Sequence, residues 1–199
     1  MRIIVQRVLA GSVTHVETGK IVGEIKKGLL LYFGINEADD EKDIDGAVKK
    51  VLNLKLWDSA DGTKRWNRSV VDMGYEILVV SQFTLYAILN GTKPDFHKSM
   101  KADKSLAYFN NAVQRFKDLY APDKIQTGAF GEYMKVCGDV DGPVNIIIDY
   151  PKTSDPSPVP SPQPDDKQKK QQNPPKQQKQ KQQKKAPEAQ HIEHKEEKN

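Results

Sequence analysis

The pattern of apolar and polar positions in the first 150 residues is mainly that of β-strands. Residues 77–80 (ILVV) are four consecutive branched or aliphatic side chains, a run expected for a strand that is buried on both faces. Residues 28–35 (GLLLYFGI) predict a second central strand. The alternating segments 12–16 and 21–25 flank a turn that contains Gly19, which predicts a β-hairpin.

Further strands are predicted at the two ends of this region. Residues 1–10 are rich in Ile and Val, and Arg7, which interrupts them, is expected on an exposed edge. Residues 126–150 contain two more segments with β pattern, separated by Gly142 and Pro143. Because proline has no amide hydrogen to donate to a sheet, these two residues are expected to form a turn that projects from it.

Two segments have the periodicity of amphipathic helices. Residues 39–52 carry acidic side chains in the first turn, where the helix dipole favours them, followed by a regular apolar stripe. Residues 103–120 form the clearer pattern and end before Pro122. Between the helices, residues 54–57 (LKLW) predict another strand. We therefore expect an α/β fold in which mixed β-sheet layers pack against two long helices.

The composition of the chain changes at residue 151. Residues 151–199 contain 9 of the 12 prolines, tracts of Lys and Gln, and no Trp, Tyr, Phe, Leu or Met. Such a segment buries too little apolar surface to offset the entropy of ordering it. We predict one folded domain over residues 1–150 and a disordered Lys/Gln/Pro-rich tail over residues 151–199.

The charge of the chain is divided unevenly between these two parts. The tail has 11 Lys and 7 acidic residues and so carries the whole net charge of +4, while the domain has 20 basic and 20 acidic residues. A neutral domain argues against broad, sequence-independent binding of nucleic acid by the fold itself. Attraction to RNA would come from local patches or, weakly, from the tail.

The sequence also indicates a compartment. The single cysteine, Cys137, excludes an internal disulfide and is typical of a reducing compartment. There is no signal-peptide pattern at the start and no apolar run near the roughly 20 residues that span a bilayer. We expect a soluble, cytoplasmic protein without membrane contact.

Candidate chemistry lies where the 77–80 strand ends, at Ser81, Gln82, Phe83 and Thr84. If the chain stays extended, Gln82 and Thr84 point to the same side as a pair of donors and acceptors. Such an ending is either a polar strand terminus, or ST-turn, or the lining of a pocket.

Other candidate groups give weaker signals. In the loop 90–97, Lys93 and His97 flank Phe96, an arrangement that clamps a phosphate or a stacked base or is simply a solvated loop with one anchoring aromatic. The histidines His191 and His194 lie in the tail without a second pair of ligands, so we expect no metal and no cofactor.

Five motifs occur in order along residues 1–150, and each alone would be weak. They are the N-terminal strand with its hairpin, SQFTL at 81–85, GTKPDFH at 91–97, TGAFG at 127–131 and DGPV at 141–144. Together they resemble the D-aminoacyl-tRNA deacylases. The resemblance implies a homodimer that hydrolyses the ester joining a D-amino acid, or glycine, to the 3′-terminal ribose of tRNA, a proofreading reaction of translation.

The resemblance also implies roles for particular residues. In that family each subunit inserts a Gly-cis-Pro turn into its partner's pocket, where backbone carbonyls bind the α-amino group and leave no room for an L side chain. Here the turn is Gly142–Pro143, and Arg7 matches the arginine that helps hold it. The implied catalytic floor is Ser81, Gln82, Phe83 and Thr84, and the other implied substrate-binding residues are Phe130, Gly131 and Met134.

The route of hydrolysis is less determined by these residues. Thr84 is a candidate nucleophile, but neither histidine of the domain, His15 or His97, completes a Ser/His/Asp-type set. We favour attack by water assisted by the substrate's own 2′-hydroxyl, which the resemblance also suggests, with backbone amides near Phe83 stabilising the oxyanion.

The turn departs from the family pattern Asn-Asp-Gly-Pro-Val-Thr, because Val140 and Asn145 stand at its two ends. These changes leave open an acyl-tRNA editor with relaxed chirality. A different class of function also remains open, a nucleic-acid-binding protein that keeps the fold and uses the basic tail.

Overall fold

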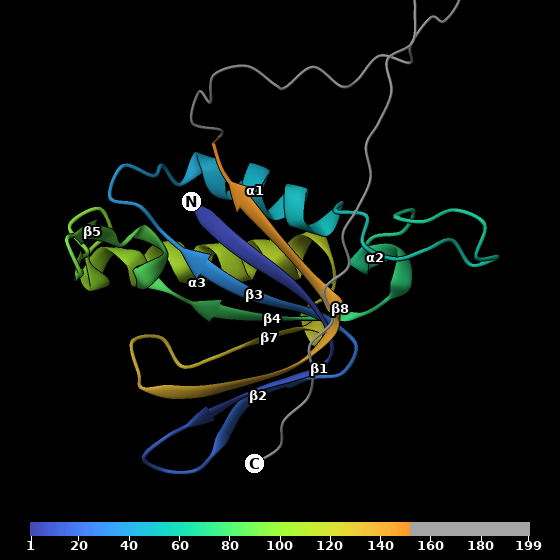
Figure 1. The fold of residues 1–199 in the computed structure, drawn as a ribbon, viewed down its shortest axis with the longest axis horizontal. Coiled ribbons are helices and arrows are strands. Elements are labelled where there is room, and N and C mark those ends of the chain that lie inside the picture. Colours follow the sequence, from blue (N-terminus) through green and yellow to red (C-terminus); the bar gives the residue numbers. More distant parts are fainter. Residues whose placement is uncertain (152–199) are drawn as a thin grey trace, which may run out of the picture. The chain divides into compact units, whose positions relative to one another are not determined.

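The computed structural model describes residues 1–151, so the predicted tail, apart from Pro151, lies outside the described residues. Six strands form one mixed sheet in the order β2–β1–β3–β4–β7, and β8 pairs with the other side of β1 (Figure 1). The pairs that involve β1 are antiparallel, whereas β3–β4 and β4–β7 are parallel. The strands are β1 (Arg2–His15), β2 (Ile21–Ile25), β3 (Gly28–Gly34), β4 (Glu76–Ser81), β7 (Ile125–Thr127) and β8 (Met134–Asp149).

Strand β4 is buried on both faces, as the sequence predicts. Ile77 and Val79 face one apolar cluster, while Leu78 and Val80 face a second cluster on the opposite side of the sheet. Successive side chains of a strand point to opposite faces, so a continuous aliphatic run is required where both faces are covered.

The two faces of the sheet are covered in different ways. Helices α1 (Lys42–Leu52) and α3 (Ala102–Leu119) pack on the first cluster, and both lie on one side of the sheet in Figure 1. The second cluster is enclosed by β2 and the first half of β8, so the sheet curls over itself and is nearly closed like a barrel. Within residues 1–151 no helix is long and apolar enough to cross a bilayer.

Several predicted elements differ in detail. Residues 54–57 do not form a strand, because only an isolated bridge joins Trp57 to Arg68. A short helix, α2 (Val70–Met73), was not predicted, and the 90–97 loop contains a small hairpin. That hairpin consists of β5 (Ile88–Asn90) and β6 (Lys93–Asp95).

The expectation of an exposed, edge-strand Arg7 is wrong. Strand β1 has neighbours on both sides, β3 and β8, and the Arg7 side chain is only 18% exposed. A long arginine can lie in such a position because its aliphatic stem packs along the sheet while its head finds polar partners.

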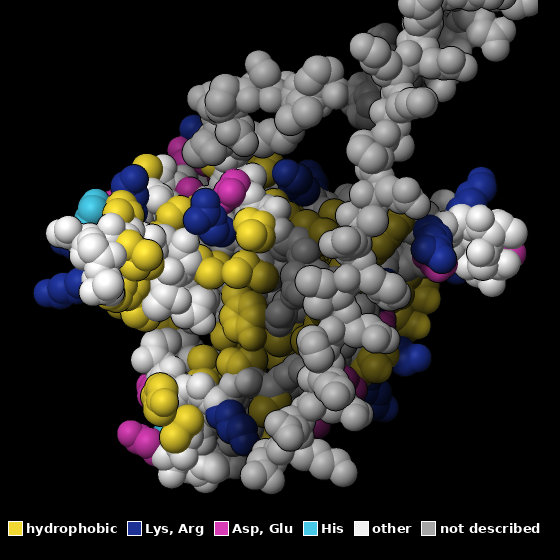
Figure 2. All heavy atoms as spheres, viewed as in Figure 1, with side chains coloured by type: hydrophobic (Ala, Val, Ile, Leu, Met, Phe, Trp, Pro, Cys, Tyr) yellow, Lys and Arg dark blue, Asp and Glu magenta, His cyan; other side chains and the backbone are white. Residues whose placement is uncertain are grey.

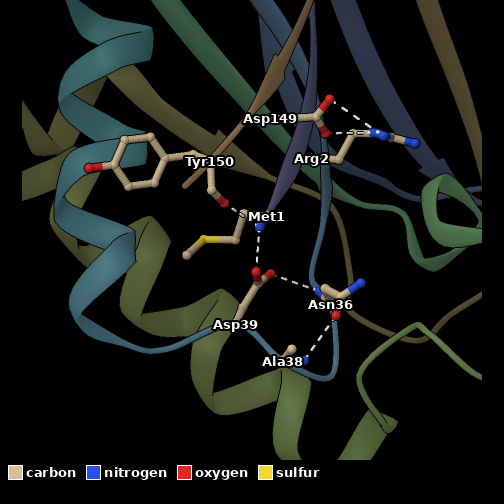
Figure 3. A network of polar contacts seen from close by, with 7 residues as sticks. All are labelled: Met1, Arg2, Asn36, Ala38, Asp39, Asp149 and Tyr150. Atoms are coloured by element: carbon tan, nitrogen blue, oxygen red, sulfur yellow. Dashed lines mark hydrogen bonds and ion pairs between the residues drawn. The ribbon is translucent and has the colours of Figure 1, made fainter. Parts of the chain in front are cut away.

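Polar contacts tie the first strand to the end of the last one (Figure 3). The Met1 amine lies 2.6 Å from Asp39 Oδ1 and donates to the Tyr150 carbonyl oxygen at 2.5 Å. Next along β1, Arg2 Nε donates to Asp149 Oδ1 at 2.8 Å. These contacts fix the alignment of the start of β1 with the end of β8.

Candidate active site

A cavity of about 690 Å³ opens where β3 and β4 end. Its lining comes from three other parts of the chain besides these strand ends: the Phe96–Ser99 loop, the start of α3, and residues 130–136 at the start of β8. The volume is that of a site for a small molecule or the end of a larger one.

The cavity brings together most of the residues that the sequence singled out. Ser81, Gln82 and Phe83 form one part of the lining, and Phe130, Gly131 and Met134 form another. Two segments about fifty residues apart in sequence thus meet at one site. Thr84, Arg7, Gly142 and Pro143 do not line it.

The chain does not remain extended beyond β4, contrary to the expectation. Gln82 still pairs with the sheet, because its amide donates to the Phe33 carbonyl at 3.0 Å, but residues Phe83–Tyr86 form a 3₁₀ turn. The predicted meeting of Gln82 and Thr84 nevertheless occurs within this turn. Gln82 Nε2 donates to Thr84 Oγ1 at 2.5 Å.

The start of this turn offers backbone donors. The first amides of a helical turn have no partner within the turn, and the Phe83 and Thr84 amides donate no other hydrogen bond among residues 1–151. The turn is fixed in place, because Ser99 Oγ donates to the Phe83 carbonyl at 2.7 Å and the Phe83 ring packs edge-on against Phe96 with centroids 5.0 Å apart. Such fixed donors suit a developing oxyanion.

Helix α3 contributes residues that the sequence did not identify. Lys101, Ala102 and Ser105 line the cavity at the helix N-terminus, where the dipole favours negative charge. The sequence signal that could have identified these residues is that the helical pattern of residues 103–120 begins directly after the 91–97 motif.

The wall opposite is tightly packed. The Ala129 amide lies 3.0 Å from Met134 Sδ, and a Cβ on Gly128 would come within 2.9 Å of the same sulfur. Phe130 packs against Phe109 of α3 with ring centroids 5.5 Å apart. A side chain at position 128 would therefore require the end of the Met134 side chain to move.

The Gly142–Pro143 segment projects from β8, as predicted, but it does so inside a continuous strand. Gln6 pairs with Asn145 and Val8 with Val140, so four residues of β8 lie opposite Arg7 alone. Gly142 has φ 109°, a conformation that side-chain-bearing residues rarely adopt.

The expected cis Gly142–Pro143 bond is not found. The bond is trans, and the cis peptide bond in residues 1–151 is Tyr150–Pro151. The change of chain direction is made instead by the positive φ of Gly142 and by the three surplus residues of β8.

Arg7 holds the base of this projecting turn. Its Nε lies 2.9 Å from Asp141 Oδ2, and its Nη1 donates to the Leu56 carbonyl at 2.5 Å. The pairing with Asp141 is an ion pair and lacks the alignment of a hydrogen bond, because Nε has no hydrogen-bond partner.

Both histidines of the domain lie beside carboxylates, and one of these carboxylates, Glu132, lines the cavity. His97 Nδ1 lies 2.6 Å from Asp95 Oδ1, and hydrogen bonds from the His97 amide and ring hold the pKa of Asp95 below its usual value. His15 pairs with Glu132 at 3.5 Å. Burial, with the nearby charge of Asp39, raises the pKa of Tyr86 far above its ordinary value, so this phenol stays protonated and is no base. No three His, Cys, Asp or Glu side chains of the described part are grouped as a metal site.

Comparison with solved structures supports this architecture. A structure described as c-Myc DNA Unwinding Element Binding Protein aligns with a TM-score of 0.72 at 40% identity, over 76% of this chain and 99% of that one. A structure described as a probable eukaryotic D-amino acid tRNA deacylase aligns with a TM-score of 0.64 over 74% of this chain and 97% of that one. At 16% identity it indicates the fold alone.

Comparison with known sequences gives the family. D-aminoacyl-tRNA deacylase of Dictyostelium discoideum is 46% identical over 149 residues, 75% of this chain and 97% of that protein. D-aminoacyl-tRNA deacylase 1 of Leishmania major is 42% identical over 154 residues, 77% of this chain and all of that protein. A model of the D-Tyr-tRNA(Tyr) deacylase family matches residues 4–149, and the chain therefore belongs to this family.

Proposed function

We propose that this chain hydrolyses the ester bond of D-aminoacyl-tRNA, and of mischarged glycyl-tRNA, and releases free tRNA and the amino acid. The observation that carries the proposal is the family match over residues 4–149, which spans every segment that lines the cavity. Deacylation of D-aminoacyl-tRNA is a hydrolase reaction that needs no cofactor, because an aminoacyl ester is already activated.

Within the cavity, the residues from 81 to 84 are the proposed catalytic segment. The Phe83 and Thr84 amides are placed to stabilise the oxyanion, and the Gln82–Thr84 hydrogen bond fixes the side chains beside it. Water, assisted by the 2′-hydroxyl of the substrate, is the proposed nucleophile. The opposite wall, with Phe130, Gly131 and Met134, is proposed to hold the terminal nucleoside.

Selection against L-amino acids is assigned to the Gly142–Pro143 turn of a partner subunit. Two observations support a homodimer. The turn does not line the cavity of its own chain, and exposed apolar side chains lie on β8, which carries it, and on the neighbouring β1: Val140 is 36%, Ile147 65% and Leu9 42% exposed. A rigid backbone turn is well suited to exclude L side chains by steric clash. Backbone atoms are present whatever the residue type, and they cannot change rotamer as a side chain can.

The test is hydrolysis of D-Tyr-tRNA, L-Tyr-tRNA and Gly-tRNA by the full chain and by a fragment that ends at residue 151. Loss of the D and Gly esters with the L ester intact is the expected result, for both proteins. Light scattering or analytical ultracentrifugation of the same samples measures the predicted dimer. Absence of hydrolysis of all three esters would overturn the proposed function.

Relaxed chirality is a second candidate, favoured by the two residues that depart from the family turn. Asn145 accepts a hydrogen bond from Gln6 Nε2 at 2.8 Å, so its side chain is engaged across the strands, and Val140 faces Val8 without a polar contact. In the same assay, this candidate predicts hydrolysis of all three esters.

Binding of nucleic acid as the main function is a third candidate, favoured by the name of the c-Myc DNA Unwinding Element Binding Protein structure. If residues 152–199 provide this binding, the affinity for DNA or RNA should fall steeply with salt and the fragment should lose that slope. Equal affinity and equal salt dependence of the full chain and the fragment would exclude a role of the tail.

A further inference from the structure

Trp66 has an unusual backbone conformation. With φ 54°, it is the only residue other than glycine in residues 1–151 with a positive φ. Its side chain is also 54% exposed, although it is the largest kind of apolar side chain. A bulky residue in this region of φ is strained and persists only where its surroundings hold it, often at functional sites.

Hydrogen bonds hold the chain on both sides of Trp66. Its amide donates to Asp58 Oδ1 at 3.3 Å, and the Arg68 amide donates to the Trp57 carbonyl at 2.8 Å. The segment 57–68, here called the Trp66 hairpin, projects beyond α2 in Figure 1, and basic side chains gather at this edge in Figure 2. The position of Trp66 is therefore fixed by the hairpin.

The Trp66 ring lies against Arg7. The Arg7 Cζ is 6.0 Å from the ring centroid, within the range of a cation–π contact. The same guanidinium donates to the Leu56 carbonyl and pairs with Asp141, and its Nη2 lies 3.2 Å from the position that a Cβ on Gly142 would take. Arg7 is thus enclosed between the Trp66 hairpin and the turn.

The hydrogen bond to the Leu56 carbonyl fixes one Nη atom of Arg7, whereas the contact with Asp141 constrains the guanidinium less. The Asp141 carboxylate is one-third exposed, and an ion pair in such a setting contributes little by itself. Because Arg7 Nε makes no aligned hydrogen bond, the pair with Asp141 does not fix the plane of the guanidinium. The Trp66 ring, whose centroid lies 6.0 Å from Arg7 Cζ, supplies a further constraint.

We propose that Trp66 is a positioning residue for chiral selection, which acts through Arg7 on the Asp141–Gly142 part of the turn. The inference rests on the proposed function, in which this turn excludes L side chains. A steric filter discriminates only as well as its wall is fixed. Loss of the Trp66 ring lets Arg7 and the turn move, so an L-aminoacyl ester enters more often while the D ester still fits.

The experiment compares Trp66→Ala and Trp66→Phe in the full chain, with kcat/KM measured on D-Tyr-tRNA and L-Tyr-tRNA. In Trp66→Ala we expect hydrolysis of the L ester to rise about tenfold, the equivalent of one cation–π contact, and that of the D ester to stay within about twofold. Trp66→Phe keeps an aromatic face and should restore most of the discrimination.

A double variant of the same hairpin, Lys64→Ala with Arg65→Ala, is the matched control. Both side chains are exposed and belong to no ion pair within residues 1–151, so this variant tests a second role of the hairpin, contact with the phosphates of tRNA. That role predicts a higher KM for both esters and an unchanged ratio between them.

An unchanged ratio of D to L hydrolysis in Trp66→Ala would overturn the proposal. The NMR signal of the Arg7 Nε–H group gives a reading that is independent of activity, since the Trp66 ring current should shift it in the wild type and not in Trp66→Ala. A wild type that cleaves no D ester would refute the proposed function, whereas an unshifted Arg7 signal would refute the contact itself. If Trp66→Ala does not fold, Trp66→Leu takes its place with the same expectation.

Discussion

The side-chain amide of Gln82 donates a hydrogen bond to the hydroxyl oxygen of Thr84, with 2.5 Å between Nε2 and Oγ1. Thr84 has no carboxylate or imidazole partner among residues 1–151 that would accept its proton. A hydroxyl without a base is a poor nucleophile, so this pair serves better to orient the Gln82 amide beside the substrate.

Replacement of Thr84 by alanine should therefore slow the reaction without abolishing it. Loss of one orienting hydrogen bond predicts a decrease in kcat of about tenfold on D-Tyr-tRNA. Thr18→Ala, in the β1–β2 turn, is the control and should behave like the wild type. Complete inactivity of Thr84→Ala, with activity kept in Thr84→Ser and an acyl-enzyme seen by mass spectrometry, would identify Thr84 as the nucleophile instead.

Gly142→Ala should weaken both stability and discrimination. With φ 109° and with Arg7 Nη2 3.2 Å from the new Cβ, the substitution is strained and displaces Arg7, at a cost of about 1–3 kcal/mol in the free energy of unfolding. Urea unfolding measures the first effect, and the ratio of D to L hydrolysis the second.

Gly74→Ala separates these two effects. Gly74 ends α2 with φ 66° and has open space around its Cβ position, so the variant should lose stability and keep its discrimination. Equal loss of discrimination in both variants would mean that stability, not the geometry of the turn, determines selection.

Ser69→Ala should destabilise the fold by about 1 kcal/mol. The buried Ser69 hydroxyl accepts from the Asp72 amide at 3.2 Å, and Asp72 Oδ2 accepts from the Ser69 amide at 2.7 Å, which completes a capping box at α2. Lys55→Ala, which removes only an exposed ion pair with Asp72, should cost about half as much or less in the same unfolding measurement.

Stability should also fall in acid through Asp61. Hydrogen bonds from Ser59 and Thr63 lower the pKa of Asp61 to about 2. The unfolded chain binds this proton at about pH 3.9, so the contribution of Asp61 is complete above that pH and is lost as the pH falls towards 2.

Thermal unfolding at pH 5 and pH 3 tests this sign. The wild-type Tm should fall between the two values by more than that of Asp61→Asn, which has no such proton to gain. Glu17→Gln removes another exposed carboxylate as a control. An equal fall of Tm in the wild type and in Asp61→Asn would contradict the prediction.

Sequence patterns predict the parts of this fold that depend on local periodicity. The run 77–80 identifies β4, and the stripe at 103–120 identifies α3 to within one residue at each end. Sequence patterns fail where contacts between residues distant in sequence determine the structure. Residues 54–57 have strand character but no neighbouring strand, and Arg7 is enclosed only because β8, more than a hundred residues later, pairs beside it.

The candidate site also combines features that local sequence predicts with features that depend on long-range contacts. The polar ending at Ser81–Thr84 is visible in sequence, but the 3₁₀ turn that joins Gln82 to Thr84 is not. Ser99 and Ser105 line the cavity because of the placement of the loop before α3 and of the start of α3. The role inferred for Trp66 depends on a contact with Arg7 across 59 positions of sequence, which no local pattern indicates.

The pairing of β1 with β8 has a consequence for synthesis of the chain. Arg2–His15 leaves the ribosome well before its partner Met134–Asp149, which is made more than a hundred residues later. Until then β1 has a free edge rich in Ile and Val, which is open to pairing with other chains. Contacts this distant in sequence are also slow to form. A nascent chain that stalls before residue 134 should therefore aggregate or require a chaperone, however stable the finished domain is.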